Sequence, residues 1–76
     1  MAVIIPARDE ADRIAATVRA CRSIPRVDLV VVVDDGSADS TQDHARAAGA
    51  VTVRHSVTRG KASALETGAG VVAMRD

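Results

Sequence analysis

Two adjacent aspartates, Asp34 and Asp35, follow five consecutive apolar residues and precede Gly36 and Ser37. Carboxylates at such a place could accept hydrogen bonds from a nucleobase or from ribose hydroxyls, and glycine allows the backbone to approach a ligand closely. An ordinary turn between a strand and a helix also favours aspartate and glycine. We favour a ligand site, because two neighbouring carboxylates repel each other unless their charge is used.

A second residue that could bind a ligand is Lys61, which follows Gly60 where a last helix is predicted to begin. The free backbone N–H groups and the dipole at a helix N-terminus favour an anion such as phosphate. Together with the two aspartates, this lysine favours a nucleotide or another phosphate-bearing ligand.

Three short apolar stretches that could position these groups are predicted as strands, over residues 2–5, 29–33 and 51–54. The middle stretch is bounded by polar residues, which is typical of a strand buried on both faces. Pro6 is expected to end the first strand, because proline cannot donate a ladder hydrogen bond.

Three helices are predicted to follow these strands. Asp9 is expected to cap the first helix, whose apolar residues recur at helical spacing; they are Ala11, Ile14, Ala15, Val18 and Cys21. The second helix is expected from about residue 39 to residue 48, with a stop at Gly49. The third is expected to bury Leu65, Ala69 and Val72, and to pack tightly at Gly68 and Gly70.

Alternating strands and helices predict an α/β fold in three layers, with an open parallel sheet of order β-α-β-α-β-α. All strands of a parallel sheet end at one edge, where ligands bind in such folds. Residues 6–10, 34–37 and 55–61 should therefore cluster there. We expect His55 to be a solvated loop histidine, and His44 to lie on the exposed side of its helix.

Composition limits the classes of protein that fit. The 76 residues include no aromatic residue, and the ten basic and ten acidic residues give no net charge, which argues against general nucleic-acid binding. A lone cysteine, Cys21, and no signal-like segment fit the cytoplasm. No apolar run approaches the ~20 residues of a transmembrane helix.

Several well-known site motifs are absent from the sequence. No strand is followed by Gly-x-Gly-x-x-Gly, and Gly60 with Lys61 lacks the remainder of a P-loop. Gly36-Ser37 does not form a Gly-x-Ser-x-Gly nucleophile elbow, and the cysteine and two histidines lack zinc-ligand spacing.

The segments 3–10, 30–41 and 58–65 together resemble the amino-terminal part of family 2 glycosyltransferases, GT-A-type enzymes that use nucleotide-sugar donors. Family members usually carry Pro-Ala-x-Asn-Glu, Val-Asp-Asp-Gly-Ser-x-Asp-x-Thr and Asn-x-Gly-Lys-x-x-Ala-Leu at these places. Within the family the sequence looks most similar to polyprenyl-phosphate sugar transferases and glucosyl-phosphoglycerate synthases. The resemblance implies that residues 1–76 are a single, incomplete nucleotide-sugar-binding α/β domain, a partial Rossmann-like GT-A half.

The resemblance also implies a donor site. The nucleotide-sugar-binding residues would be Pro6, Ala7, Arg8, Glu10, Asp34, Asp35, Gly60 and Lys61. The first loop would line the base and ribose pocket, the two aspartates would contact the base or ribose, and the lysine would reach the base or diphosphate. Asp9 and Thr58 depart from the family pattern, in which asparagine is common at both places.

The family reaction transfers a sugar from a UDP- or GDP-sugar to an acceptor, here of polyprenyl-phosphate or phosphoglycerate type. A later Asp-x-Asp signature holds a divalent metal, Mg²⁺ or Mn²⁺, and the catalytic base follows it; neither segment is found in this sequence. The resemblance therefore implies a donor-binding part that is inactive alone, without catalytic or metal-ligating residues.

Two other hypotheses remain open at this stage. The half-sheet could be a non-catalytic nucleotide-binding module that acts through a partner. Alternatively, residues 2–5 could present a bare strand edge that pairs with a second copy and forms a homodimer.

Overall fold

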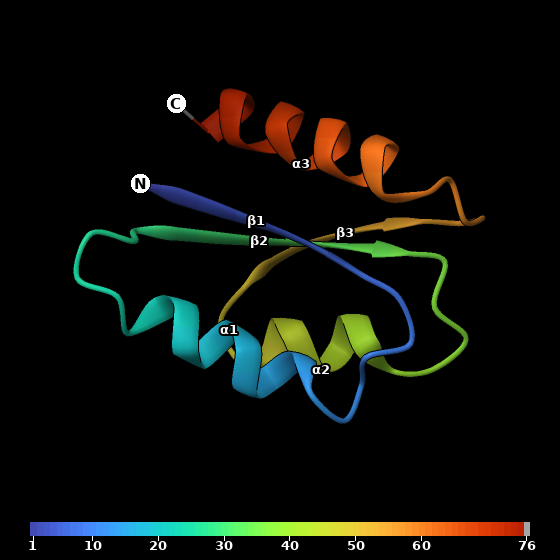
Figure 1. Ribbon diagram of the computed structural model, residues 1–76, viewed down its shortest axis with the longest axis horizontal. Helices are drawn as coiled ribbons and strands as arrows, with labels where there is room; N and C mark the ends of the chain where they lie inside the picture. The colour runs from blue at the N-terminus through green and yellow to red at the C-terminus, as the bar shows by residue number, and fades with distance from the viewer. Residues whose placement is uncertain (76) are drawn as a thin grey trace.

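The computed structural model describes residues 1–75, in which three strands alternate with three helices. The elements are β1 (Ala2–Ala7), α1 (Ile14–Arg22), β2 (Leu29–Asp35), α2 (Thr41–Ala47), β3 (Val51–His55) and α3 (Lys61–Arg75). The strands form one parallel sheet in the order β1-β2-β3. Helices α1 and α2 cover one face and α3 covers the other (Figure 1). This arrangement confirms the predicted three-layer α/β fold.

The central strand β2 carries the core on both of its faces. Val30 and Val32 pack in a cluster with α1 and α2, whereas Val31 and Val33 pack in a second cluster with Ala64 of α3. All four valines are at most 3% exposed. The unbroken apolar run in the sequence thus reflects a strand that is covered on both sides.

The close approach of α3 to the sheet depends on Gly68. A Cβ atom added to Gly68 would lie 2.3 Å from Ile4 Cγ2 and 3.3 Å from Val33 Cγ2, so only glycine fits without a shift. The predicted tight packing is therefore confirmed at Gly68. It is wrong at Gly70, where an added Cβ would meet nothing within 4 Å.

The buried face of α3 differs from the prediction. Ala64 and Gly68 are buried, whereas Leu65 is 44% exposed and Ala69 is also exposed. The expected burial of Leu65 and Ala69 is wrong, because the contact of Gly68 with β1 fixes the rotation of the helix. Val72 is half-buried against the cluster of Val31, Val33 and Ala64.

The first strand and the first helix have boundaries that the sequence did not reveal. β1 continues through Pro6, which is tolerated because β1 pairs on one side only, with β2, within residues 1–75. Helix α1 begins at Ile14, and Arg13 rather than Asp9 is its N-cap. The predicted cap is wrong, because Asp9 has a φ of +53° and serves another loop.

The parallel strands all end at the right-hand edge of the sheet in Figure 1, where the loops before α1, α2 and α3 come together. Pairing of two copies through β1 stays a prediction. No helix within residues 1–75 has the length and apolar character needed to cross a bilayer.

Candidate functional site

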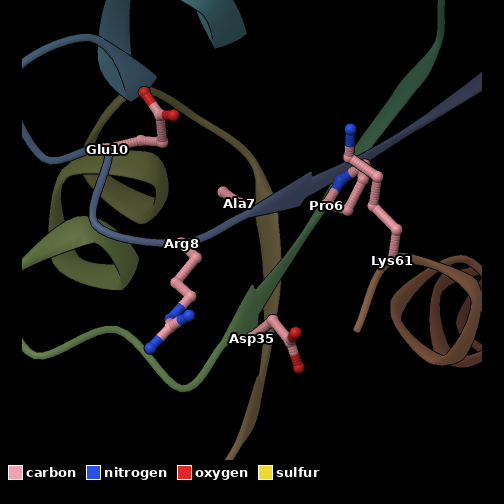
Figure 2. Close-up of a pocket in the computed structure, with 6 residues that line it drawn as sticks. All are labelled: Pro6, Ala7, Arg8, Glu10, Asp35 and Lys61. Carbon is pink, nitrogen blue, oxygen red and sulfur yellow. The ribbon is translucent and has the colours of Figure 1, made fainter. Parts of the chain in front are cut away.

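A cavity of about 200 Å³ opens at this edge of the sheet, between the end of β1, the end of β2 and the start of α3 (Figure 2). It is lined by Pro6, Ala7, Arg8, Glu10, Asp35 and Lys61. The structure thus brings together six of the eight residues that the sequence placed in a donor site, from three segments far apart in the chain.

The carboxylate of Asp35 holds the loop between β3 and α3. Its Oδ1 accepts the backbone N–H of Arg59 at 2.9 Å, and its Oδ2 accepts that of Gly60 at 2.8 Å. The Arg59 N–H, followed by the His55 side chain, lowers the pKa of the Asp35 carboxyl from 3.8 to about 2. Asp35 is therefore ionised at neutral pH and binds two consecutive amides of the loop.

Gly60 is the second of the two residues whose amides Asp35 holds, and it directly precedes Lys61, the first residue of α3. Its φ of +95° lies in the left-handed region that favours glycine, although an added Cβ would meet no other atom within 4 Å. Its carbonyl accepts the N–H of Ala64 in the first turn of α3. The turn thereby places Lys61 at the N-terminus of the helix, where its side chain extends toward Pro6 (Figure 2).

Asp34 is fully buried and does not line the cavity. Its Oδ1 accepts the backbone N–H of Ser37 at 2.9 Å, and its Oδ2 accepts Arg54 Nη1 at 3.3 Å. Arg54 Nη2 also donates to the carbonyl of Ser37 at 2.7 Å. The structure therefore gives Asp34 a contact with its own loop, where the family resemblance implied contact with the base or ribose.

The loop fixed by Asp34 holds the loop after β1 through a reciprocal pair of hydrogen bonds. The N–H of Asp9 donates to Ser37 Oγ at 2.8 Å, and the N–H of Ala38 donates to Asp9 Oδ1 at 2.8 Å. In addition, the N–H of Glu10 donates to Thr41 Oγ1 at 2.9 Å. These contacts set the backbone directly after Arg8, which lines the cavity.

His55 was expected to be solvated, and this prediction is wrong. It is the last residue of β3 and is 6% exposed, because β3 extends one residue further than predicted. Its Nδ1 lies 2.8 Å from Asp35 Oδ1, and its Nε2 lies 2.8 Å from Thr67 Oγ1. The alternation of Val51 and Val53 along the strand was the signal that could have placed His55 on the face of α3. His44 is exposed, as predicted.

The cavity carries charges of both signs. Glu10 Oε2 already pairs with Arg13 Nη2 at 2.7 Å. By contrast, no carboxylate of residues 1–75 lies within ion-pair distance of the Lys61 ammonium group. A cation at a helix N-terminus, beside a cavity, favours an anionic ligand.

Comparison with known proteins decides the family. The family model described as glycosyl transferase family 2 matches residues 2–72. The chain belongs to glycosyl transferase family 2. Its parallel sheet, with helices on both faces, agrees with solved structures of GT-A-type members, so the fold implied by the sequence motifs is confirmed.

One similar solved structure is glucosyl-3-phosphoglycerate synthase from Mycobacterium tuberculosis, in complex with Mn²⁺, UDP and glucosyl-3-phosphoglycerate. It is 32% identical with a TM-score of 0.72, over 84% of this chain and 26% of that one. A mycobacterial protein is 34% identical with a TM-score of 0.71, over 84% and 24% of the two chains. The uncharacterized protein MJ1222 of Methanocaldococcus jannaschii is 38% identical over 66 residues, 87% of this chain and 27% of its own. The present chain thus spans about a quarter of the length of these relatives.

The two departures from the family motifs are both accommodated in the loops around the cavity. Asp9 binds the N–H of Ala38, and the hydroxyl of Thr58 donates to the carbonyl of Asp35 at 3.0 Å. Among residues 1–75, no group of three or more histidine, cysteine, aspartate or glutamate side chains could hold a metal ion. The described residues therefore do not fit the divalent cation that the family uses.

Proposed function

We propose that this chain forms the donor-binding part of a glycosyltransferase and takes a nucleotide-diphospho-sugar. The observation that carries the proposal is the cavity at the carboxyl edge of the sheet, which joins Lys61 at a helix N-terminus to Arg8 and Glu10. Ligands of open α/β sheets bind at this edge. Membership of glycosyl transferase family 2 supports the same assignment.

Each part of the cavity suits one part of such a donor. Pro6 and Ala7 at the end of β1, with Arg8 directly after them, would line the base and ribose. Glu10 could accept hydrogen bonds from ribose hydroxyls. The ammonium group of Lys61 would balance the diphosphate charge.

Gly60 would let the backbone approach the ligand, because it has no side chain. We assign Asp35 to the ligand side of the cavity, since it lines the cavity. We assign Asp34 a positioning role through the loop of Ser37, because Asp34 has no exposed surface.

The acceptor and the metal belong to the same proposal. A similar structure was solved with Mn²⁺, UDP-glucose and phosphoglyceric acid, which supports a UDP-sugar donor and an acceptor of phosphoglycerate type over polyprenyl phosphate. We place sugar transfer in a full-length family member that supplies the ligands for Mg²⁺ or Mn²⁺. We expect the 76-residue chain to bind the donor without transferring the sugar.

A direct test uses the fact that Lys61 is the only lysine of the sequence. Reductive methylation with ¹³C labels two amines, Lys61 Nζ and the N-terminus of Met1. The Met1 amine contacts Asp28 and the carbonyl of Arg26, so it is held by groups outside the cavity and provides an internal control. UDP or GDP, added with and without Mg²⁺, should shift the NMR signal of Lys61 and leave that of Met1 in place.

Charge variants complete the test. Lys61→Gln should weaken UDP binding by about tenfold or more, because a charge-assisted hydrogen bond is lost. Arg19→Gln removes the same charge from the exposed end of α1 and should leave the affinity unchanged. The proposal is wrong if millimolar UDP and GDP leave the Lys61 signal unmoved, or if the two variants bind alike.

A further inference from the structure

His55 is a buried, titratable residue for which the donor site has so far provided no role. It bridges three elements, since it ends β3, contacts Asp35 at the end of β2 and contacts Thr67 within α3. It does not line the cavity. In the register of the sheet, His55 is paired directly with Asp35, so both side chains leave the sheet on the face of α3.

The chemistry of the two contacts fixes the tautomer of the ring. An ionised carboxylate only accepts hydrogen bonds, so His55 Nδ1 carries the proton that is donated to Asp35 Oδ1. In the neutral ring, Nε2 then accepts the hydroxyl proton of Thr67. The neutral ring thus acts as a donor toward the carboxylate and as an acceptor toward the helix.

The contact with Asp35 bears on the turn that precedes Lys61. Asp35 Oδ1 receives both the His55 ring and the N–H of Arg59, while Oδ2 receives the N–H of Gly60. A ring donor on Oδ1 fixes the rotation of the carboxylate about its side-chain bonds. With that rotation fixed, both amides meet an oxygen at hydrogen-bond distance.

We propose that His55 is a positioning residue of the donor cavity, which orients Asp35 so that the Arg59–Gly60 turn holds Lys61 at the cavity. The inference rests on the proposed function, because it assigns the purpose of this contact to nucleotide binding. In this proposal Nδ1 is the ring atom that orients Asp35, and the contact of Nε2 with Thr67 is not needed for that orientation.

Two amide variants separate the two ring nitrogens. In His55→Asn the side-chain amide nitrogen lies near the place of Nδ1 and can donate to Asp35. In His55→Gln the longer side chain brings the amide to the place of Nε2, near Thr67. Thr67→Val removes only the second contact, at nearly constant volume.

Amide hydrogen exchange provides a readout that needs no ligand. His55→Gln should lose the protection of the Arg59 and Gly60 amides, while the amides of the central strand β2 stay protected. His55→Asn and Thr67→Val should keep both. A general packing role would instead lower protection throughout the sheet, in step with global stability.

Nucleotide binding provides the second readout. His55→Gln should weaken UDP binding by about tenfold, the effect of one hydrogen bond to a charged group, and His55→Asn should restore it. The inference is overturned if His55→Gln keeps both the amide protection and the affinity, or if Thr67→Val loses them as His55→Gln does. If His55→Gln does not fold, His55→Leu takes its place. The same two quantities, the protection of the Arg59 and Gly60 amides and the affinity for UDP, then decide the inference.

Failure of the proposed function gives a different pattern from failure of the inference. Absence of UDP binding by the unmodified chain would overturn the donor-site proposal, and with it the purpose assigned to His55. Normal UDP binding that is lost in Lys61→Gln but unaffected in His55→Gln would overturn the role of His55 alone.

Discussion

Asp34 and Asp35 are adjacent in the chain, yet their carboxylates hold two different loops on opposite faces of the sheet. Asp34 binds the N–H of Ser37 in the loop before α2, and Asp35 binds the N–H of Gly60 in the loop before α3. Successive residues of a strand point to opposite faces, so one strand end can serve both loops. Two adjacent residues at the end of β2 thus position the loop before α2 and the loop before α3.

Removal of the buried carboxylate of Asp34 should destabilise the fold. Asp34→Ala leaves the Ser37 N–H and Arg54 Nη1 without their acceptor, and we expect a loss of about 2–3 kcal/mol in the free energy of unfolding. Asp43→Ala is the matched control, since Asp43 pairs with Arg46 at 3.9 Å on the exposed surface of α2. The control should change stability by less than about 0.5 kcal/mol. Urea denaturation measures both, and equal effects would contradict the role given to Asp34.

Alanine substitutions at the two glycines of α3 should have opposite signs. Gly68→Ala places a methyl group 2.3 Å from Ile4 Cγ2 and should destabilise the chain, by about 1–3 kcal/mol as for other overpacked sites. Gly70→Ala faces open space and should stabilise it by about 0.5–1 kcal/mol, through helix propensity alone. Thermal unfolding followed by circular dichroism distinguishes the two. A gain in stability for Gly68→Ala would mean that α3 does not approach β1 this closely.

The stability contributed by Asp35 should depend on pH in the acid range. Its pKa is lowered from 3.8 to about 2 by the N–H of Arg59 and then by His55. A lowered folded-state pKa stabilises the fold above the unfolded value, and this contribution is lost as the pH falls through the folded value. The stability difference between the unmodified chain and Asp35→Asn should therefore be constant above about pH 5 and shrink between pH 4 and pH 2.

Denaturation at a series of pH values measures this difference. The pKa values of Asp28 and Asp39 are also lowered, the first by the N-terminal amine and the second by the Thr41 hydroxyl. The comparison with Asp35→Asn removes their contribution, because both carboxyls are present in both proteins. A difference that stays constant down to pH 2 would contradict the assigned hydrogen bonds of Asp35.

The turn at Gly60 should tolerate asparagine better than alanine. Gly60→Ala meets no steric contact but must adopt a φ of +95°, so we expect a loss of about 1–2 kcal/mol from backbone strain. Asparagine enters the left-handed region more readily, so Gly60→Asn should lose less. Urea denaturation of the two variants tests the order. A stabilising Gly60→Ala would indicate that the turn adopts another conformation in solution.

The sheet and its ligand edge could be predicted from the sequence because their signals are local. The apolar run before Asp34 marks a strand buried on both faces, and alternation with helices makes the sheet parallel. Once the strands are parallel, the residues after each strand must share one edge. The cavity residues Pro6, Asp35 and Lys61 were found in this way.

The errors concern contacts between residues far apart in the chain. Alternation along β3 places His55 on the face of α3, but it does not contain the contact with Thr67, twelve residues later on that helix. The rotation of α3 depends on Ile4 of β1, which lies directly against Gly68. Asp9 was taken for a helix cap because its type suits one, but its carboxylate is used by Ala38 across the cavity edge.

The hydrogen bonds that hold the loops on both sides of the cavity run between protein atoms, from Asp34 to Ser37, from Ser37 to Asp9 and from Asp35 to Gly60. The site is therefore preorganised, and the order of its walls does not depend on a ligand. A ligand that enters it loses little conformational entropy from the protein, so more of its contact energy remains as affinity. Association should then be governed by diffusion and by the charge of Lys61, with no slow loop closure.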